Sequence, residues 1–177
     1  METLQWGPDL ETGIAVIDAQ HKRLVQLVNQ MYEARQKHDM NTVGAVIPEM
    51  VDYSVSHFNF EEELMQDAGY GLLKVHKWLH EQFVNKLPDF QARYQAGEDI
   101  TEELYIMLSR WLTHHICRED RGYVQSIKAY LAQNGEVSAP GGQHSFWKRL
   151  KSSTLATLFP RTIISRCLSA TSWPCAA

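Results

Sequence analysis

Residues 72–87 read LLKVHKWLHEQFVNKL and combine apolar residues with two histidines at helical spacing. His76 and His80 are four residues apart, and the same spacing continues into Phe83 and Val84. Side chains three and four residues apart lie on one face of an α-helix. The stretch therefore predicts an amphipathic helix over about 72–96, with Pro88 bending its last turns. The side chains expected on its inner side are Val75, Leu79, Phe83, Val84 and Leu87.

Three more segments show helical periodicity, and no segment shows the alternation that is typical of a β-strand. One begins at Asp18, a good N-cap residue, and runs to about Lys37. Another has Asn41 or Thr42 as its N-cap candidate and reaches about Asp67, with a kink or a later start at Pro48. The last begins near Thr101 and is followed by a short helical segment over Tyr123–Leu131.

Four helices with short connections predict an all-α fold, an antiparallel up-and-down four-helix bundle. Residues 1–16 contain Trp6-Gly7-Pro8 and Thr12-Gly13, which indicate an ordered N-terminal arm. Leu24, Val25, Val28 and Met31 form the apolar stripe of the first helix. The stripe of the fourth helix consists of Leu104, Met107, Leu108, Trp111 and Leu112.

The charge distribution predicts a domain boundary near residue 135. Residues 136–177 contain five basic residues and one acidic residue, a net charge of +4, whereas residues 1–135 carry −8. Ser138-Ala139-Pro140-Gly141-Gly142 has a linker composition. We expect one domain over 1–135 and a disordered, basic, Ser/Thr-rich tail over 136–177. A basic amphipathic helix near 146–159 that touches a membrane surface or a partner is the alternative.

Composition excludes several classes of function. The net charge of −4 over 177 residues argues against nucleic acid as the main partner. No stretch approaches about 20 apolar residues, so no membrane span is expected. The three cysteines, Cys117, Cys167 and Cys175, form no C-x-x-C pair, which favours a reducing compartment. With no export signal visible after Met1, we expect a cytoplasmic protein.

Metal-binding side chains fall on the buried stripes of all four helices. His21 precedes Val25 by four residues, and His115 extends the stripe of the fourth helix. Unpaired imidazoles and carboxylates in an apolar core would cost several kcal/mol. A metal cation would supply the missing partner, and bundle cores are a known place for such sites. The side chains concerned are His21, His57, Glu61, His76, His80 and His115.

The number and type of these ligands predict two metal ions. Five imidazoles exceed what one tetrahedral ion needs, and the absence of a cysteine ligand disfavours structural zinc. Imidazole with oxygen suits iron, copper, nickel or zinc, and a bridging carboxylate suits paired iron. A further anion should be Asp120, yet it lies about 140° from His115 on an ideal helix. A local distortion or the helix end would have to bring it inward, and Glu119 and Glu62 remain rivals.

The chain resembles the hemerythrins, in particular their single-domain bacterial form, over about residues 4–133. Seven ligand positions in the family's order and spacing make the resemblance highly specific. The matching motifs are Trp6 with Thr12-Gly13-Ile14, Ile17-Asp18-x-Gln20-His21-Lys22-x-Leu24, His57-Phe58-x-x-Glu61-Glu62, His76-x-x-x-His80-x-x-Phe83 and Trp111-Leu112-x-x-His115-Ile116-x-x-x-Asp120-x-x-Tyr123.

The resemblance implies a division of ligands between two iron ions. One iron is held by His76, His80 and His115, and the other is held by His21 and His57. Glu61 and Asp120 bridge the two ions, together with an oxo or hydroxo group. Dioxygen binds at the open position of the two-histidine iron, in a pocket lined by Leu112.

The implied function is reversible dioxygen binding, for transport, storage or delivery to an oxygen-consuming enzyme. Ferritin-like di-iron enzymes use mostly carboxylate ligands, whereas this set is rich in histidine, which favours a carrier that is not an enzyme. The alternatives are a di-iron oxidase, peroxidase or nitric oxide reductase on the same scaffold, or an oxygen-sensor module.

Overall fold

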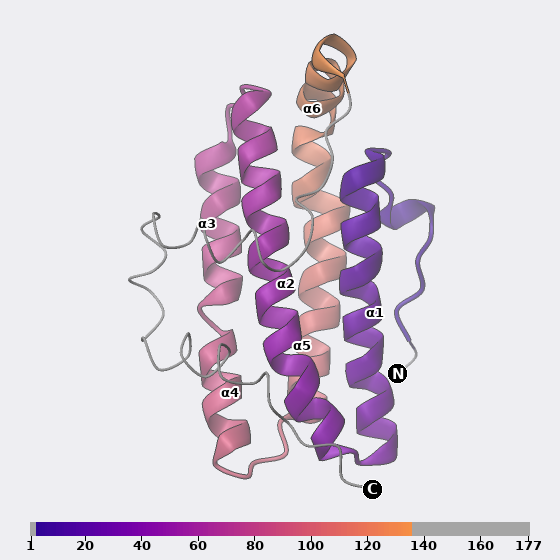
Figure 1. Cartoon of the computed structure of the whole chain (residues 1–177), viewed down its shortest axis with the longest axis vertical. Helices are drawn as coiled ribbons and strands as arrows, with labels where there is room; N and C mark the ends of the chain where they lie inside the picture. The colour runs from indigo at the N-terminus through magenta and orange to yellow at the C-terminus, as the bar shows by residue number, and fades with distance from the viewer. Residues whose placement is uncertain (1–2, 136–177) are drawn as a thin grey trace, which may run out of the picture. The chain divides into compact units, whose positions relative to one another are not determined.

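The computed structural model describes residues 3–135, which form an antiparallel four-helix bundle (Figure 1). The predicted fold class is confirmed. The first two bundle helices are single elements, the third is broken in two, and the fourth changes its winding midway. In chain order the elements are η1 (Pro8–Leu10), α1 (Ala15–Lys37), α2 (Met40–Asp67), α3 (Leu73–Val84), α4 (Leu87–Gln95), α5 (Thr101–His114), η2 (His115–Asp120) and α6 (Arg121–Asn134).

The N-terminal arm is tied to α1 at two places. The backbone of Leu4 exchanges hydrogen bonds of 2.8 and 2.9 Å with the side chain of Asn29. Asp18 accepts hydrogen bonds from the backbone and hydroxyl of Thr12, at 2.8 and 2.7 Å, and from the backbone of Gly13. The prediction that Asp18 caps the helix was wrong, because α1 already begins at Ala15 and this carboxylate holds the arm instead.

The second bundle helix, α2, begins slightly earlier than predicted, at Met40 rather than after Asn41 or Thr42. Asp39 is its N-cap and accepts a hydrogen bond of 3.1 Å from the backbone of Thr42. An aspartate here satisfies one of the backbone donors that a helix start leaves without an intrahelical partner. The helix passes through Pro48 and ends at Asp67, as expected.

The third bundle helix is broken rather than bent. α3 ends at Val84, and α4 begins at Leu87 with Pro88 in its first turn. A proline ring clashes with the carbonyl four residues earlier, which is that of Val84, whereas proline is favoured at a helix start. The placement of Val75 on the inner side was also wrong, since it is 56% exposed. Phe83 and Leu87 are buried as predicted.

The fourth bundle helix runs without interruption from Thr101 to Asn134 through the π-helix η2. The segment expected as a separate short helix is therefore its continuation. In a π-helix the backbone bonds join residues five apart rather than four. The side chains that follow η2 are consequently turned relative to an uninterrupted α-helix.

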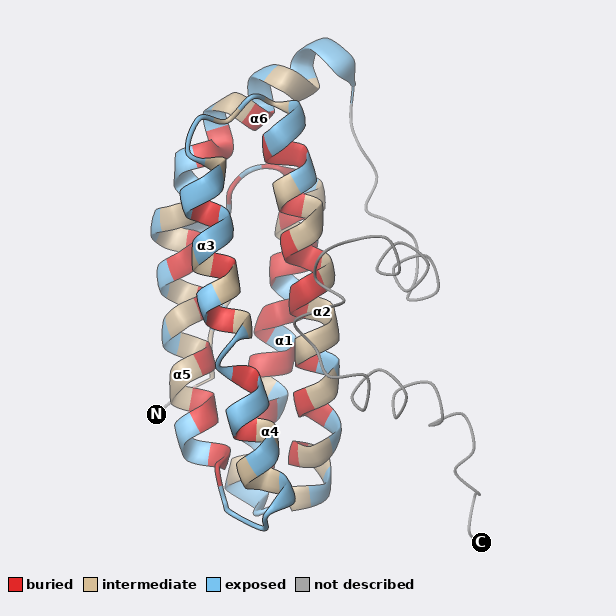
Figure 2. Ribbon diagram, turned by 90° about the vertical axis from the view of Figure 1, so that its left-hand side faces the viewer, coloured by how far each residue is buried: buried red, intermediate tan, exposed pale blue. Residues whose placement is uncertain are grey.

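The buried stripes face one another along the axis of the bundle (Figure 2). They form two apolar clusters, a larger one that includes Leu24, Phe58 and Ile116, and a smaller one that includes Ile17 and Tyr123. None of the helices in residues 3–135 combines the length and apolar character that a membrane span requires. The predicted tail, residues 136–177, lies outside the described residues.

Candidate metal centre

All seven predicted ligand residues meet in one buried cluster at the junction of the two apolar clusters. His21 follows Ile17 and precedes Leu24 on α1, and so lies between the two clusters along that helix. None of the seven side chains is more than 3% exposed. The residues are His21 from α1, His57 and Glu61 from α2, His76 and His80 from α3, and His115 and Asp120 from η2.

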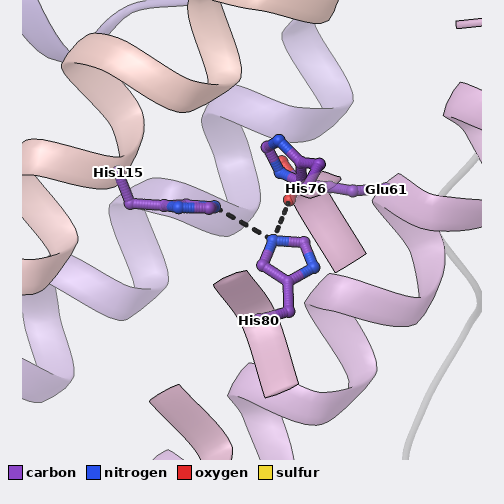
Figure 3. A group of neighbouring side chains, drawn as sticks. All are labelled: Glu61, His76, His80 and His115. Carbon is purple, nitrogen blue, oxygen red and sulfur yellow. Dashed lines mark hydrogen bonds and ion pairs between the residues drawn. The ribbon is translucent and has the colours of Figure 1, made fainter. Parts of the chain in front are cut away.

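The potential ligand atoms form two groups that share Glu61. One oxygen of Glu61 and one nitrogen each of His76, His80 and His115 lie within 4.8 Å of one another (Figure 3). In a second group, His21, His57 and Glu61, the ligand atoms also lie within 4.8 Å of one another. Three imidazoles thus gather on one side of the carboxylate and two on the other.

The carboxylate of Glu61 faces both groups. Its Oε1 lies 3.5 Å from Nε2 of His21 and 3.6 Å from Nε2 of His57. Its Oε2 lies 3.5 Å from Nε2 of His80. Glu61 is therefore placed to bridge two cations, one in each group.

Asp120 faces the same two groups from the opposite helix. Its Oδ2 lies 3.3 Å from Nε2 of His21, while its Oδ1 lies 3.1 Å from Nε2 of His115. On an ideal α-helix Asp120 would point away from His115. The π-helix η2 is the local distortion that turns it inward. Of the rivals, Glu119 contacts the exposed His114, and Glu62 contacts the outward nitrogen of His80.

The spacing of these atoms fits bound cations. Two donors, each about 2.1 Å from one ion and at right angles, lie about 3.0 Å apart. The Nε2 atoms of His80 and His115 are 2.9 Å apart, and the carboxylate contacts span 3.1 to 3.6 Å. Within residues 3–135, seven buried atoms of His21, His57, Glu61, His76 and Asp120 have no hydrogen-bond partner. Such groups cost about 1–3 kcal/mol each if unsatisfied, and cations would satisfy the six of these atoms that face the centre, all except Nδ1 of His21.

The electrostatics of the centre keep its carboxylates ionised. Burial alone would raise the pKa of Glu61, but the histidines His57, His21 and His80 outweigh burial and hold that pKa well below its usual range. The pKa of Asp120 is lowered too, by His115 and His21, against burial and the charge of Glu61. Two anions in an apolar core favour the binding of a cation.

The net pKa shifts of the buried histidines differ in direction, although burial lowers the pKa of each. Burial lowers the pKa of His57 to about 3. Burial, together with His80 and His115, lowers the pKa of His76 to about 4. For His21 burial also acts downward, but the adjacent carboxylates of Asp120 and Glu61 raise its pKa to about 9. Neutral imidazoles are the form that binds metals, so His57 and His76 are ready to bind at neutral pH.

Further side chains hold the cluster from outside, and the sequence alone did not reveal their roles. Gln20 and Glu62 contact the outward nitrogens of His57 and His80, at 2.8 and 3.1 Å. The buried hydroxyl of Tyr123 donates to Oε1 of Glu61. All three lie in the motifs quoted above, but each has its partner on another helix, which periodicity cannot show.

Aromatic rings and an aliphatic side chain surround the histidines of the larger group. Phe58 stacks on His80 with ring centroids 3.9 Å apart, and Trp111 stacks on His115 at 4.3 Å. Leu112 is buried in the larger apolar cluster, one turn before His115. His114, the neighbouring histidine, has a side chain that is 69% exposed.

Comparison with known proteins agrees with this geometry. The family model described as "Hemerythrin HHE cation binding domain" matches residues 12–127. Bacteriohemerythrin of Pseudomonas aeruginosa (strain LESB58) is 44% identical over 142 residues, which cover 80% of this chain and 93% of that protein. Bacteriohemerythrin of Stenotrophomonas maltophilia (strain R551-3) is 46% identical with the same coverage. A crystal structure of wild-type hemerythrin superposes with a TM-score of 0.67 at 26% identity, covering 71% of this chain and 98% of that one. The chain therefore belongs to the hemerythrin family.

Proposed function

We propose that this chain holds two iron ions, joined by an oxo or hydroxo bridge, and binds dioxygen reversibly. The observation that carries the proposal is the pair of buried carboxylates, Glu61 and Asp120, that each face both groups of imidazoles. Transport, storage or delivery of oxygen to an oxygen-consuming enzyme are the roles that such binding serves.

The ligands divide unequally between the two ions. His76, His80 and His115 would hold one ion, and His21 and His57 the other. With both carboxylates and the solvent-derived bridge, the first ion would have six ligands and the second five. Two ferrous ions so held would supply the electrons and the single open position that reversible dioxygen binding requires.

The donor set favours iron among the metals that bind imidazole. Imidazole and carboxylate ligands suit iron, copper, nickel and zinc, but two shared carboxylates suit a paired iron centre. Cys117, the one cysteine within the described residues, lies outside the cluster and donates to the backbone oxygen of Asp9 at 3.2 Å. No thiolate therefore competes for the site among residues 3–135.

The protein around the centre favours binding over turnover of a substrate. The ligand side chains are at most 3% exposed, so access is restricted to small molecules. Leu112 and Ile116 are buried in the apolar cluster beside His115 and limit the entry of water. A centre rich in histidine also carries less negative charge than the carboxylate-rich sites of ferritin-like enzymes, which disfavours highly oxidised iron.

Oxygen cycling of the iron-loaded protein tests the proposed function. The reduced protein is exposed to air, deoxygenated under argon and exposed again, while its visible absorption is followed. We expect a coloured form that appears, disappears and returns with little loss of amplitude. Irreversible bleaching together with consumption of a reductant, hydrogen peroxide or nitric oxide would identify an enzyme instead.

A further inference from the structure

The outward nitrogens of His80 and His57 are bonded to acceptors of different charge. Nδ1 of His80 donates to Oε1 of Glu62 at 3.1 Å, and Nδ1 of His57 donates to Oε1 of Gln20 at 2.8 Å. The Nε2 atoms of both rings point into the centre. One side of the centre is thus backed by a carboxylate and the other by a neutral amide.

Glu62 is in turn held by a lysine at the surface. Its Oε2 accepts a hydrogen bond of 2.9 Å from Nζ of Lys77, which lies one turn before His80 on α3. The side chain of Glu62 is 13% exposed and that of Lys77 is 48% exposed. A chain of charge-assisted hydrogen bonds therefore connects solvent to a candidate iron ligand.

We propose that Glu62 and Lys77 set the electron-donating strength of His80 and thereby the ease with which the iron pair is oxidised. A carboxylate that accepts from the outer N–H of a metal-bound imidazole makes that imidazole a stronger donor. Lys77 donates a hydrogen bond to the same carboxylate and so weakens its effect on His80. Both are positioning residues that touch no iron, and the inference rests on the proposed function.

The two residues must act in opposite directions. Removing the charge of Glu62 leaves a weaker acceptor and one negative charge fewer near the centre, so ferric iron is less favoured. Removing the charge of Lys77 frees Glu62 to act fully on His80, so ferric iron is more favoured. The effect of Lys77 should be the smaller one, since its ammonium is half exposed and screened by salt. A structural role for the ion pair would shift both variants in the same direction.

The experiment compares Glu62→Gln with Lys77→Met in the iron-loaded full chain. The midpoint potential of the iron pair is measured by spectroelectrochemistry, together with the rate at which the oxygenated protein autoxidises. For Glu62→Gln we expect a higher potential and autoxidation slowed by about tenfold, the lower end of what outer partners of a metal ligand contribute. For Lys77→Met we expect a lower potential and faster autoxidation.

Three further variants keep the test decisive. Gln20→Glu places a carboxylate behind His57 and should lower the potential. In the double variant Glu62→Gln/Lys77→Met, the effect of the lysine should largely vanish, because it acts through the carboxylate. The control is an exposed ion pair on α1, Glu33 with Lys37 at 3.7 Å. Glu33 lies about 18 Å along the helix from His21. Neutralising both residues should leave the midpoint potential unchanged.

The outcomes separate this inference from the proposed function. If Lys77→Met retains two irons and binds oxygen reversibly, yet its potential is unchanged or raised, the inference is wrong and the proposed function stands. A shift of both single variants in one direction would also overturn it. If Glu62→Gln fails to retain iron, the direction in which Lys77→Met and Gln20→Glu shift the midpoint potential still tests the inference. Both should lower it. If the wild-type chain takes up no iron, the proposed function itself fails.

Discussion

Oδ1 of Asp120 lies 3.1 Å from Nε2 of His115, although the two residues are five positions apart on one helix. In an α-helix, residues five apart point in directions about 140° apart. The π-helix η2 spans these two residues and its backbone bonds join positions five apart, so both side chains face the centre. Single π-helical turns often occur at functional sites, and here the turn brings in the carboxylate that we propose as the second bridge.

Replacing Asp120 by Ala should reduce bound iron to well below two per chain. The substitution removes a carboxylate that faces both groups of imidazoles, and an outer carboxylate cannot take its place. Inductively coupled plasma mass spectrometry of the purified variant measures the loss. Glu119→Ala is the matched control, because Glu119 is adjacent, carries the same charge and pairs with the exposed His114 at 3.5 Å. Full iron in the Asp120 variant, or equal loss in both, would contradict the assignment.

The variants His115→Ala and His114→Ala should differ sharply in the amount of iron that they retain. His115 is buried and 2.9 Å from His80, whereas the side chain of His114 is 69% exposed. We expect the first variant to lose most of its iron and the second to keep two ions per chain. Both remove one imidazole from adjacent positions, so a general effect on the helix would lower the iron content of both.

Leu112→Ala should accelerate autoxidation of the oxygenated protein. The shortened side chain leaves space beside His115 into which water can enter. It should also lower the free energy of unfolding by about 2–5 kcal/mol, as such core truncations do. Leu108→Ala is the control, since Leu108 is equally buried one turn earlier. It should show a similar loss of stability by urea unfolding, and comparable autoxidation in both variants would mean that Leu112 does not guard the oxygen site.

The metal-free bundle should lose stability as the pH falls below about 6.5. The pKa values of His57 and His76, about 3 and about 4, lie below the 6.5 of an unfolded histidine. Between these values the unfolded chain binds the extra protons, so unfolding becomes easier by about 1.4 kcal/mol per pH unit for each histidine. Above pH 6.5 neither histidine affects stability. His21 acts on the alkaline side, because its raised pKa of about 9 gives stability that is lost as the pH rises from 6.5 through 9.

Urea unfolding of the metal-free protein across pH 4.5 to 9.5 measures the loss of stability on the acid side, the acid limb, and on the alkaline side. In His76→Gln the acid limb should become about half as steep, because one of the two buried neutral imidazoles is gone. A stability curve that stays flat between pH 6.5 and 4.5 would show that these rings are not buried in the neutral form.

We propose that residues 1–135 form the complete oxygen-binding domain. A chain truncated after Gly135 should therefore keep two irons and the same affinity for oxygen, measured by tonometry. Loss of iron from the truncated chain, with helix content preserved by circular dichroism, would place part of the site in residues 136–177.

Much of the fold followed from the periodicity of apolar residues, because four stripes with short connections have few ways to bury themselves. The errors arose where a residue type suits more than one environment. Asp18 has the character of an N-cap, yet it binds the arm, and the helix start at Ala15 has no side-chain cap. Val75 is as apolar as a core residue and lies next to the buried His76. Hydrophobicity alone therefore does not show that its side chain is exposed.

The centre itself was predictable to the extent that its residues share helix faces. His57 and Glu61, like His76 and His80, are four apart and needed only the rise and turn of an α-helix. Asp120 required the π-helix, for which no sequence pattern was recognised, and was supplied by family resemblance. The contacts of Gln20 and Glu62 join side chains on different helices, so they emerge only once the helices are packed.

Anomalous diffraction at the iron absorption edge, from crystals of the iron-loaded chain, would locate the two proposed ions. We predict two iron peaks about 3.5 Å apart, with Glu61 and Asp120 between them, three imidazoles on one ion and two on the other. A single peak, no peak, or peaks at surface residues away from these seven side chains would contradict the account.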